Sequence, residues 1–150
     1  MNEKPLKILL ADDDEADRLL FEEAFDELKA STSVMTVADG VELMEFLKRT
    51  ALENLPHILF LDINMPKKNG MECLKEIRGN KKFKEVSVAI YSTSSSENDM
   101  EESFLNGANV YIHKPNDFQK LKKILEKSIS YANVYQEPPF NKDNFLLRAE

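Results

Sequence analysis

The chain has 150 residues, of which 42% are hydrophobic, so it is long enough for one packed domain with a single core. Its formal net charge of −7 disfavours nonspecific binding to nucleic acid or to an anionic membrane, and no apolar run approaches the roughly 20 residues of a membrane helix. The one cysteine, Cys73, excludes an internal disulfide and a cysteine-based zinc site, and no signal-peptide pattern follows Met1, so we expect a cytoplasmic protein.

Five short apolar runs alternate along the chain with amphipathic stretches. In chain order, the runs predict β-strands at Leu6–Ala11, Ser33–Val37, His57–Leu61, Val86–Tyr91 and Val110–His113. Strands that alternate with helices are typical of a parallel sheet, so we predict a doubly wound α/β fold with helices on both faces of a five-stranded sheet. The strand order 2-1-3-4-5, one of the two common orders of such sheets, fits a chain of this size.

A polar residue precedes each predicted helix. Asp14 and Ser96 can cap the first and fourth helices, and Asn116 has capping-box spacing to Gln119 before the fifth. Asp39 and Asn69 directly precede the second and third helices. The apolar residues expected to face the sheet are Leu20, Ala24, Phe25 and Leu28 in the first helix, Val41, Met44 and Leu47 in the second, Met71, Leu74 and Ile77 in the third, and Phe118, Leu121, Leu125 and Ile129 in the fifth.

We expect residues 1–134 to form the domain and residues 135–150 to form a C-terminal tail, with no output domain. The tail carries large apolar residues, among them Tyr135, Phe140, Phe145, Leu146 and Leu147, which would be a liability if exposed on a monomer. We therefore predict that the tail packs on its own domain or helps to bury a homodimer interface with the fourth and fifth helices. Pro138 and Pro139 leave a disordered tail as the alternative.

Acidic residues gather where the first and third strands end. Asp12, Asp13 and Asp14 follow the first strand, and Asp62 follows the third. These strands are adjacent in the predicted order, and two unit charges about 4 Å apart repel by roughly 4 kcal/mol at an effective dielectric of ~20. Such a cluster is tolerated if it is solvated, protonated or bound to a cation, and its oxygen ligands suit Mg²⁺. Asp14 can serve instead as the cap of the first helix.

A hydroxyl group and an ammonium group are expected at the same edge of the sheet. The fourth strand ends at Ser92 and the fifth at Lys114. Open α/β sheets place their active sites at the carboxyl ends of the strands. An aspartate beside a divalent cation, a hydroxyl donor and a lysine has the parts needed to become an acyl phosphate, because the metal and the lysine offset the charge of the incoming phosphoryl group.

Four motifs, in this order along the chain, carry a resemblance to a known family. They are residues 8–14 (ILLADDD), residues 61–70 (LDINMPKKNG), Ser92, and residues 107–115 (GANVYIHKP). On these motifs, the segment Lys7–Ala132 resembles the receiver domain of bacterial two-component response regulators, of the stand-alone, CheY-like kind. The segment Arg49–Pro56 and the tail also resemble single-domain regulators that are paired with bacterial phytochrome-type histidine kinases.

The resemblance implies a phosphoacceptor and a Mg²⁺ site. Asp62 matches the residue that the family phosphorylates, and its carboxylate would also contact the metal. Asp13 matches a direct metal ligand, and Asp12 matches a ligand that acts mainly through water. Asn64 matches the position whose backbone carbonyl completes the metal shell.

The resemblance also implies a conformational switch. Lys114 would pair with the phosphoryl oxygens, and Ser92 would move toward the phosphoryl group once it is attached. Tyr111 matches the aromatic residue that turns inward as the hydroxyl moves. Ser92 replaces the threonine that is commoner in the family, but it keeps the hydroxyl donor, so the switch should survive. Asn64 and Ser94 occupy positions that tune hydrolysis in the family.

The function implied is that of a single-domain response regulator in a phosphorelay, which takes a phosphoryl group from a sensor histidine kinase or a phosphotransfer protein. It would catalyse only its own phosphorylation and dephosphorylation, and would signal by protein contact, without nucleic acid or membrane. Three alternatives stay open. In a phosphatase of the haloacid dehalogenase kind, the nucleophile would come from the first strand. A degenerate receiver would bind partners without phosphorylation. A flavodoxin-like carrier would need a phosphate-binding first loop, which Asp12–Asp14 disfavour.

Overall fold

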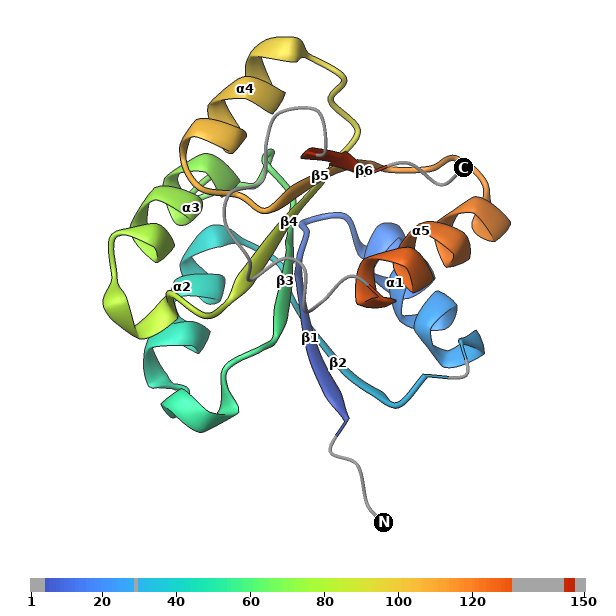
Figure 1. The fold of residues 1–150 in the computed structure, drawn as a ribbon, viewed down its shortest axis with the longest axis horizontal. Helices are drawn as coiled ribbons and strands as arrows, with labels where there is room; N and C mark the ends of the chain where they lie inside the picture. The colour runs from blue at the N-terminus through green and yellow to red at the C-terminus, as the bar shows by residue number, and fades with distance from the viewer. Residues whose placement is uncertain (1–4, 29, 131–144, 148–150) are drawn as a thin grey trace.

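The computed structural model describes residues 5–28, 30–130 and 145–147, and within them a six-stranded parallel sheet has the order β2-β1-β3-β4-β5-β6 (Figure 1). The strands are β1 (Leu6–Ala11), β2 (Thr32–Val37), β3 (Ile58–Leu61), β4 (Ser87–Ser92), β5 (Val110–His113) and β6 (Leu146–Leu147). The first five have the predicted order, and their bounds differ from the predicted ones by at most one residue. The doubly wound α/β fold is therefore confirmed, and β6 is an addition beside β5.

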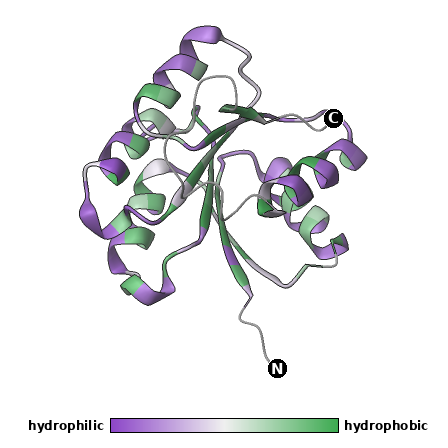
Figure 2. Cartoon of the chain, in the orientation of Figure 1, coloured by the Kyte–Doolittle hydropathy of each residue, from purple (hydrophilic) through white to green (hydrophobic). Residues whose placement is uncertain are grey.

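Helices cover both faces of this sheet. They are α1 (Glu15–Glu27), α2 (Gly40–Arg49), α3 (Gly70–Arg78), α4 (Glu97–Leu105) and α5 (Phe118–Ser130), with short 3-10 turns η1 (Leu52–Asn54) and η2 (Lys81–Phe83). Helices α1 and α5 lie on one face, and α2, α3 and α4 lie on the other (Figure 1). Figure 2 shows hydrophobic strands between helices whose outer faces are hydrophilic. No helix in the described part of the chain is long and apolar enough to cross a membrane.

Side-chain caps start α1 to α4, and the two of them that the sequence predicts, Asp14 and Ser96, are confirmed. The side chains of Asp14, Asp39, Asn69 and Ser96 each accept a hydrogen bond from the backbone N–H three residues later. The prediction that Asn116 caps the fifth helix is wrong. Helix α5 begins at Phe118, and the side chain of Asp117 accepts hydrogen bonds from the backbone N–H groups of Gln119 (2.7 Å) and Lys120 (3.4 Å). A carboxylate one residue closer to the helix takes the role predicted for Asn116.

In α1 and α2 most residues predicted to face the sheet are buried, namely Ala24, Phe25, Met44 and Leu47, but one predicted residue in each helix is exposed. Leu20 is 44% exposed and Val41 is 40% exposed, whereas Phe21 and Leu43 are fully buried. In α1, either Leu20 or Phe21 fits helical spacing with Ala24. Phe21 is the one that faces the sheet, where its ring lies 5.1 Å from the ring of Phe60 and buries more apolar area than a leucine would.

The described end of the tail packs on its own chain. Leu146 and Leu147 pair in parallel with Tyr111 and Ile112 of β5. The ring of Phe145 is buried, 5.2 Å from the ring of Phe104 in α4 and 6.2 Å from that of Tyr111. This is the first of the two packing arrangements predicted for the tail. Tyr135 and Phe140 lie outside the described residues, and the homodimer stays a prediction.

Cys73 in α3 should be unreactive in the folded protein. The side chain is fully buried, and burial raises the pKa of its thiol to about 11. Because only the thiolate attacks alkylating reagents, we expect iodoacetamide at pH 8 to leave the native chain unmodified and to add one group in guanidinium chloride, as read by intact mass. Rapid native labelling would show that α3 opens locally. The chain has no second cysteine to confuse the result.

Candidate functional site

The ends of four parallel strands bring the candidate residues to one edge of the sheet. Backbone hydrogen bonds continue the strand pairing for one step: the N–H of Asp62 donates to Ala11 at 3.0 Å, and the N–H of Lys114 donates to Ser92 at 2.8 Å. Asp62 therefore lies beside the end of β1, where Asp12 and Asp13 follow. Ser92 and Lys114 lie side by side at the ends of β4 and β5.

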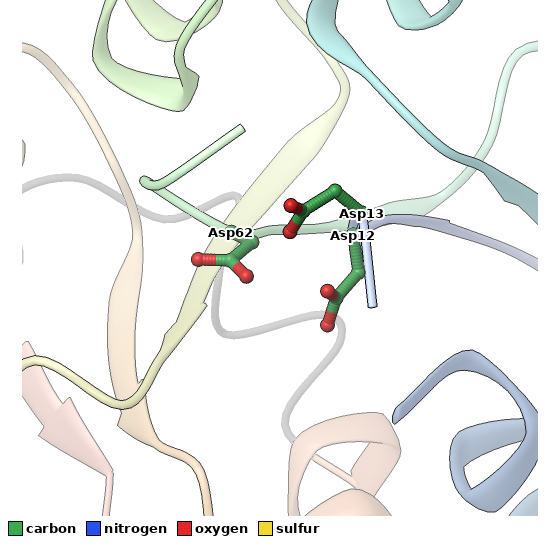
Figure 3. A group of neighbouring side chains, drawn as sticks. All are labelled: Asp12, Asp13 and Asp62. Atoms are coloured by element: carbon green, nitrogen blue, oxygen red, sulfur yellow. The ribbon is translucent and has the colours of Figure 1, made fainter. Parts of the chain in front are cut away.

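Three carboxylates form a cluster at this edge. One oxygen each from Asp12, Asp13 and Asp62 lies within 4.8 Å of the other two (Figure 3). Asp12 and Asp62 are buried, and Asp13 is exposed. Asp14, the remaining acid of the run, points its side chain to the backbone N–H of Asp17 and caps α1. The cluster has the all-oxygen donor set that Mg²⁺ and Mn²⁺ prefer, with one side open to solvent for bound water.

The hydrogen bonds of the two buried carboxylates leave one oxygen of each turned into the site. Oδ1 of Asp12 accepts from the N–H of Asp14 at 3.0 Å, and Oδ1 of Asp62 accepts from the N–H of Asn64 at 3.1 Å. Oδ2 of Asp12 is fully buried and lies 2.8 Å from Lys114 Nζ, in an ion pair without good hydrogen-bond geometry. Three carboxylates that converge on one point are costly without enough positive charge beside them, and a cation with its water shell would supply that charge. The residues present thus fit a divalent cation.

Lys114 lies at the centre of the acidic cluster. Its Nζ is 2.8 Å from Asp12 Oδ2, 2.9 Å from Asp17 Oδ2 and 3.0 Å from Asp62 Oδ2. Burial tends to lower the pKa of Lys114, but the contacts with Asp12 and Asp17 outweigh it and the pKa is raised. Burial raises the pKa of Asp12 to about 6, against the opposing effect of Lys114. One ammonium therefore does not fully compensate the carboxylates around it, which again favours a cation.

A chain of hydrogen bonds joins Ser92 to Tyr111. The backbone N–H of Ser94 donates to Ser92 Oγ at 3.1 Å, and the hydroxyl of Tyr111 donates to the carbonyl of Ser94 at 2.8 Å. Ser94 Oγ in turn donates to Asp99 of α4 at 2.7 Å. Both Ser92 and Tyr111 are fully buried, so the tyrosine points inward in this structure. The loop between β4 and α4 is thus tied to both residues.

Asp17 also lies at this site, although it was not among the residues predicted from the sequence. Asp17 lies in the first turn of α1, and its Oδ2 accepts a hydrogen bond from Lys114 Nζ at 2.9 Å. A signal was present, because the cap at Asp14 fixes the start of α1 directly after the acidic run. The residue three positions after the cap then lies one turn from the site. A separate ion pair, 3.5 Å long, joins Asp39, which follows the end of β2, to Lys67 in the loop after β3.

The sequence of the chain matches one known protein family. Residues 8–126 match the response regulator receiver domain. The chain belongs to this family. The receiver domain is 35% identical to response regulator Rcp1 of Synechocystis over 128 residues. This alignment covers 81% of this chain and 85% of Rcp1. It is 31% identical to chemotaxis protein CheY1 of Helicobacter pylori over 121 residues, in an alignment that covers 81% of this chain and 94% of CheY1.

Solved structures agree with this assignment. The phosphorylated cyanobacterial phytochrome response regulator RcpA superposes with a TM-score of 0.78 and 32% identity, over 91% of this chain and 99% of RcpA. The Mn²⁺-bound form of Rcp1 has a TM-score of 0.75 and 30% identity, with the same coverage. The receiver domain is therefore similar in extent to stand-alone, CheY-like proteins. One of these relatives binds a divalent metal, and this receiver domain carries an acidic cluster of matching chemistry.

Proposed function

We propose that this receiver domain is a single-domain response regulator, which accepts a phosphoryl group on Asp62 from a sensor histidine kinase in a Mg²⁺-dependent reaction. The observation that carries the proposal is the position of Asp62 Oδ2, 3.0 Å from Lys114 Nζ and in the same cluster as Asp12 and Asp13. Positive charge on two sides of one carboxylate, from the lysine and from a cation on the acids, suits a group that will carry a phosphoryl dianion.

The transfer needs an oxygen nucleophile and compensation of charge. An oxygen of Asp62 attacks phosphorus, and the P–N bond to the kinase histidine breaks as the O–P bond forms. Asp13, Asp62 and the carbonyl of Asn64 would hold Mg²⁺, with Asp12 acting through water. When bound, the ion offsets the charge of the phosphoryl oxygens. Lys114, which now donates to Asp62, would donate to a phosphoryl oxygen instead.

Signalling would follow from a change at Ser92. The Ser92 hydroxyl can donate a hydrogen bond to a phosphoryl oxygen on Asp62. In this structure the same hydroxyl oxygen accepts a hydrogen bond from the backbone N–H of Ser94. Movement of Ser92 would shift Ser94, whose carbonyl accepts a hydrogen bond from Tyr111. Because the Ser94 hydroxyl donates to Asp99, the start of α4 would shift as well. The face of α4 and of the sheet edge beside it, where β6 covers β5, would then be the surface whose shape reports phosphorylation to a partner protein.

Ser92→Ala should separate phosphorylation from switching. We expect Asp62 to be labelled as in the wild type, whereas the NMR resonances of Tyr111 no longer shift on phosphorylation, because the hydroxyl that senses the phosphoryl group is gone. Lys114→Ala should retain metal binding and weaken the same response. Ser95→Ala, an exposed serine of the same loop, is the matched control and should switch normally. A normal Tyr111 response in both test variants would place the switch elsewhere.

The direct test of the proposed function is labelling of the purified chain with acetyl phosphate and Mg²⁺. Intact mass should rise by one phosphoryl group, and chelation of the metal should suppress the gain. Asp14→Asn is the control within the acidic run, because Asp14 is exposed and caps α1. It should be labelled like the wild type. A wild-type chain that gains no phosphoryl group at any metal concentration would favour a degenerate receiver.

The proposed partners are proteins. The similarity to RcpA, a phytochrome response regulator, supports a kinase of the phytochrome type, acting in the cytoplasm. The acidic charge disfavours nucleic acid or membrane as a partner. The downstream target stays open. A homodimer through α4, α5 and the tail is also proposed, and sedimentation of the full chain against a version ending at Asn133 tests it. A dimer unchanged by truncation, or a phosphorylated full chain that stays monomeric, would remove the tail from the interface.

A further inference from the structure

Asp17 contacts the lysine of the site without belonging to the acidic cluster. Its Oδ2 lies 2.9 Å from Lys114 Nζ, whereas the described residues grouped as possible metal ligands are Asp12, Asp13 and Asp62. The Asp17 side chain is 32% exposed and that of Asp62 is 8% exposed, so Asp17 reaches the ammonium from the solvent side. Lys114 has three N–H donors, and one of them is committed to Asp17.

The start of α1 holds Asp17 in this position. The backbone N–H of Asp17 donates to Asp14 Oδ1 at 3.1 Å, which fixes the first turn. The next residue, Arg18, donates from Nη1 to the carbonyl of Asp12 at 2.8 Å and fastens the same turn to the acidic loop. Lys114 Nζ also lies 5.3 Å from the centre of the Tyr91 ring. Asp17 is therefore part of a rigid socket for the ammonium.

We propose that Asp17 is a positioning residue that both holds Lys114 beside Asp62 and limits the positive charge that Lys114 offers to a phosphoryl group. The inference rests on the proposed function. A phosphoryl dianion on Asp62 must compete with the Asp17 carboxylate for the same ammonium, and it also feels the negative charge of Asp17 directly. Asp17 would thereby weaken the attraction of the phosphodonor and shorten the life of the phosphorylated state.

Two substitutions separate the two roles. Asp17→Asn keeps an oxygen that can accept from Lys114 but removes the charge, so the acetyl phosphate concentration for half-maximal rate should fall by about three- to tenfold, with slower dephosphorylation. Asp17→Leu removes the acceptor as well, so the maximal rate should fall because Lys114 loses one of its three carboxylate contacts and is held less firmly. Asp17→Glu should restore values close to the wild type.

The control is Glu15→Gln, which removes one negative charge from the same exposed turn of α1 without touching Lys114. The difference between Asp17→Asn and wild type should shrink at high salt, because part of it is a charge effect near solvent. If the wild type is labelled and Asp17→Asn behaves like Glu15→Gln, the inference about Asp17 is overturned. If the wild type is not labelled, the proposed function itself fails.

Discussion

Asp62→Asn should abolish phosphoryl uptake and leave the fold intact. Asparagine has almost the shape of aspartate and keeps the oxygen that accepts the N–H of Asn64 at 3.1 Å. Its neutral amide is not a nucleophile toward phosphorus. The change also removes one carboxylate from the crowd around Lys114, so we expect no loss of thermal stability. Intact mass after treatment with acetyl phosphate and Mg²⁺ should equal the untreated mass.

Asp13→Asn distinguishes loss of the acceptor from loss of a metal ligand. Asp13 is the exposed member of the cluster and makes no ion pair with Lys114 among the described contacts. Removing its charge should raise the Mg²⁺ concentration that labelling requires, and excess Mg²⁺ should recover part of the rate. Asp62→Asn should not recover at any Mg²⁺ concentration. Equal labelling of wild type and Asp62→Asn would assign the acceptor to another residue.

Gly70→Ala should lower the free energy of unfolding by about 3 kcal/mol or more. A Cβ at Gly70 would lie 2.2 Å from the carbonyl oxygen of Asp62 and 2.8 Å from Cα of Ile63. Both are backbone atoms, so no side-chain rotation relieves the clash. The N–H of Gly70 also donates to the carbonyl of Ile63 at 2.8 Å, which binds the first residue of α3 to the loop after β3. Urea unfolding measures the loss.

Gly79→Ala is the matched control for this prediction. Gly79 ends α3 with a right-handed φ of −82°, and the nearest atom to its Cβ would be the carbonyl oxygen of Lys75 at 3.3 Å. We expect its free energy of unfolding to change by about 1 kcal/mol or less. Because the Gly70 clash involves the carbonyl of Asp62, relief of the strain must move the acceptor. Gly70→Ala should then also slow phosphorylation of the molecules that remain folded.

The strand pattern and the strand-end residues could be read from the sequence because both depend on short-range signals. A parallel strand buried on both faces is an unbroken apolar run, as Ile58–Leu61 is, and its end is marked by the first charged residue, Asp62. Parallel strands then bring their ends together by topology alone. This is why Asp12, Asp62 and Lys114 meet as expected, at distances the sequence could not supply.

The features that sequence reasoning missed depend on tertiary contacts. Leu20 and Phe21 both suit the apolar face of α1. Phe21 is the buried one because its ring packs against that of Phe60, which lies in β3. Asp17 reads as an ordinary acid in the first turn of a helix, where it favours the helix dipole, and its partner Lys114 lies 97 residues away. The pairing of β6 with β5 requires the chain to return after an interval with no strand pattern.

The two-residue strand β6 changes what the sheet offers to other chains. An edge strand exposes a row of unpaired N–H and C=O groups, and such a row is a template for intermolecular strand addition. Without β6, that row would belong to β5, beside the buried ring of Tyr111. With β6 in place, the outermost strand on this side among the described residues is Leu146–Leu147, too short to template a growing sheet. Leu146 and Leu147 thus cover part of the β5 edge and leave less of it available for pairing with another chain.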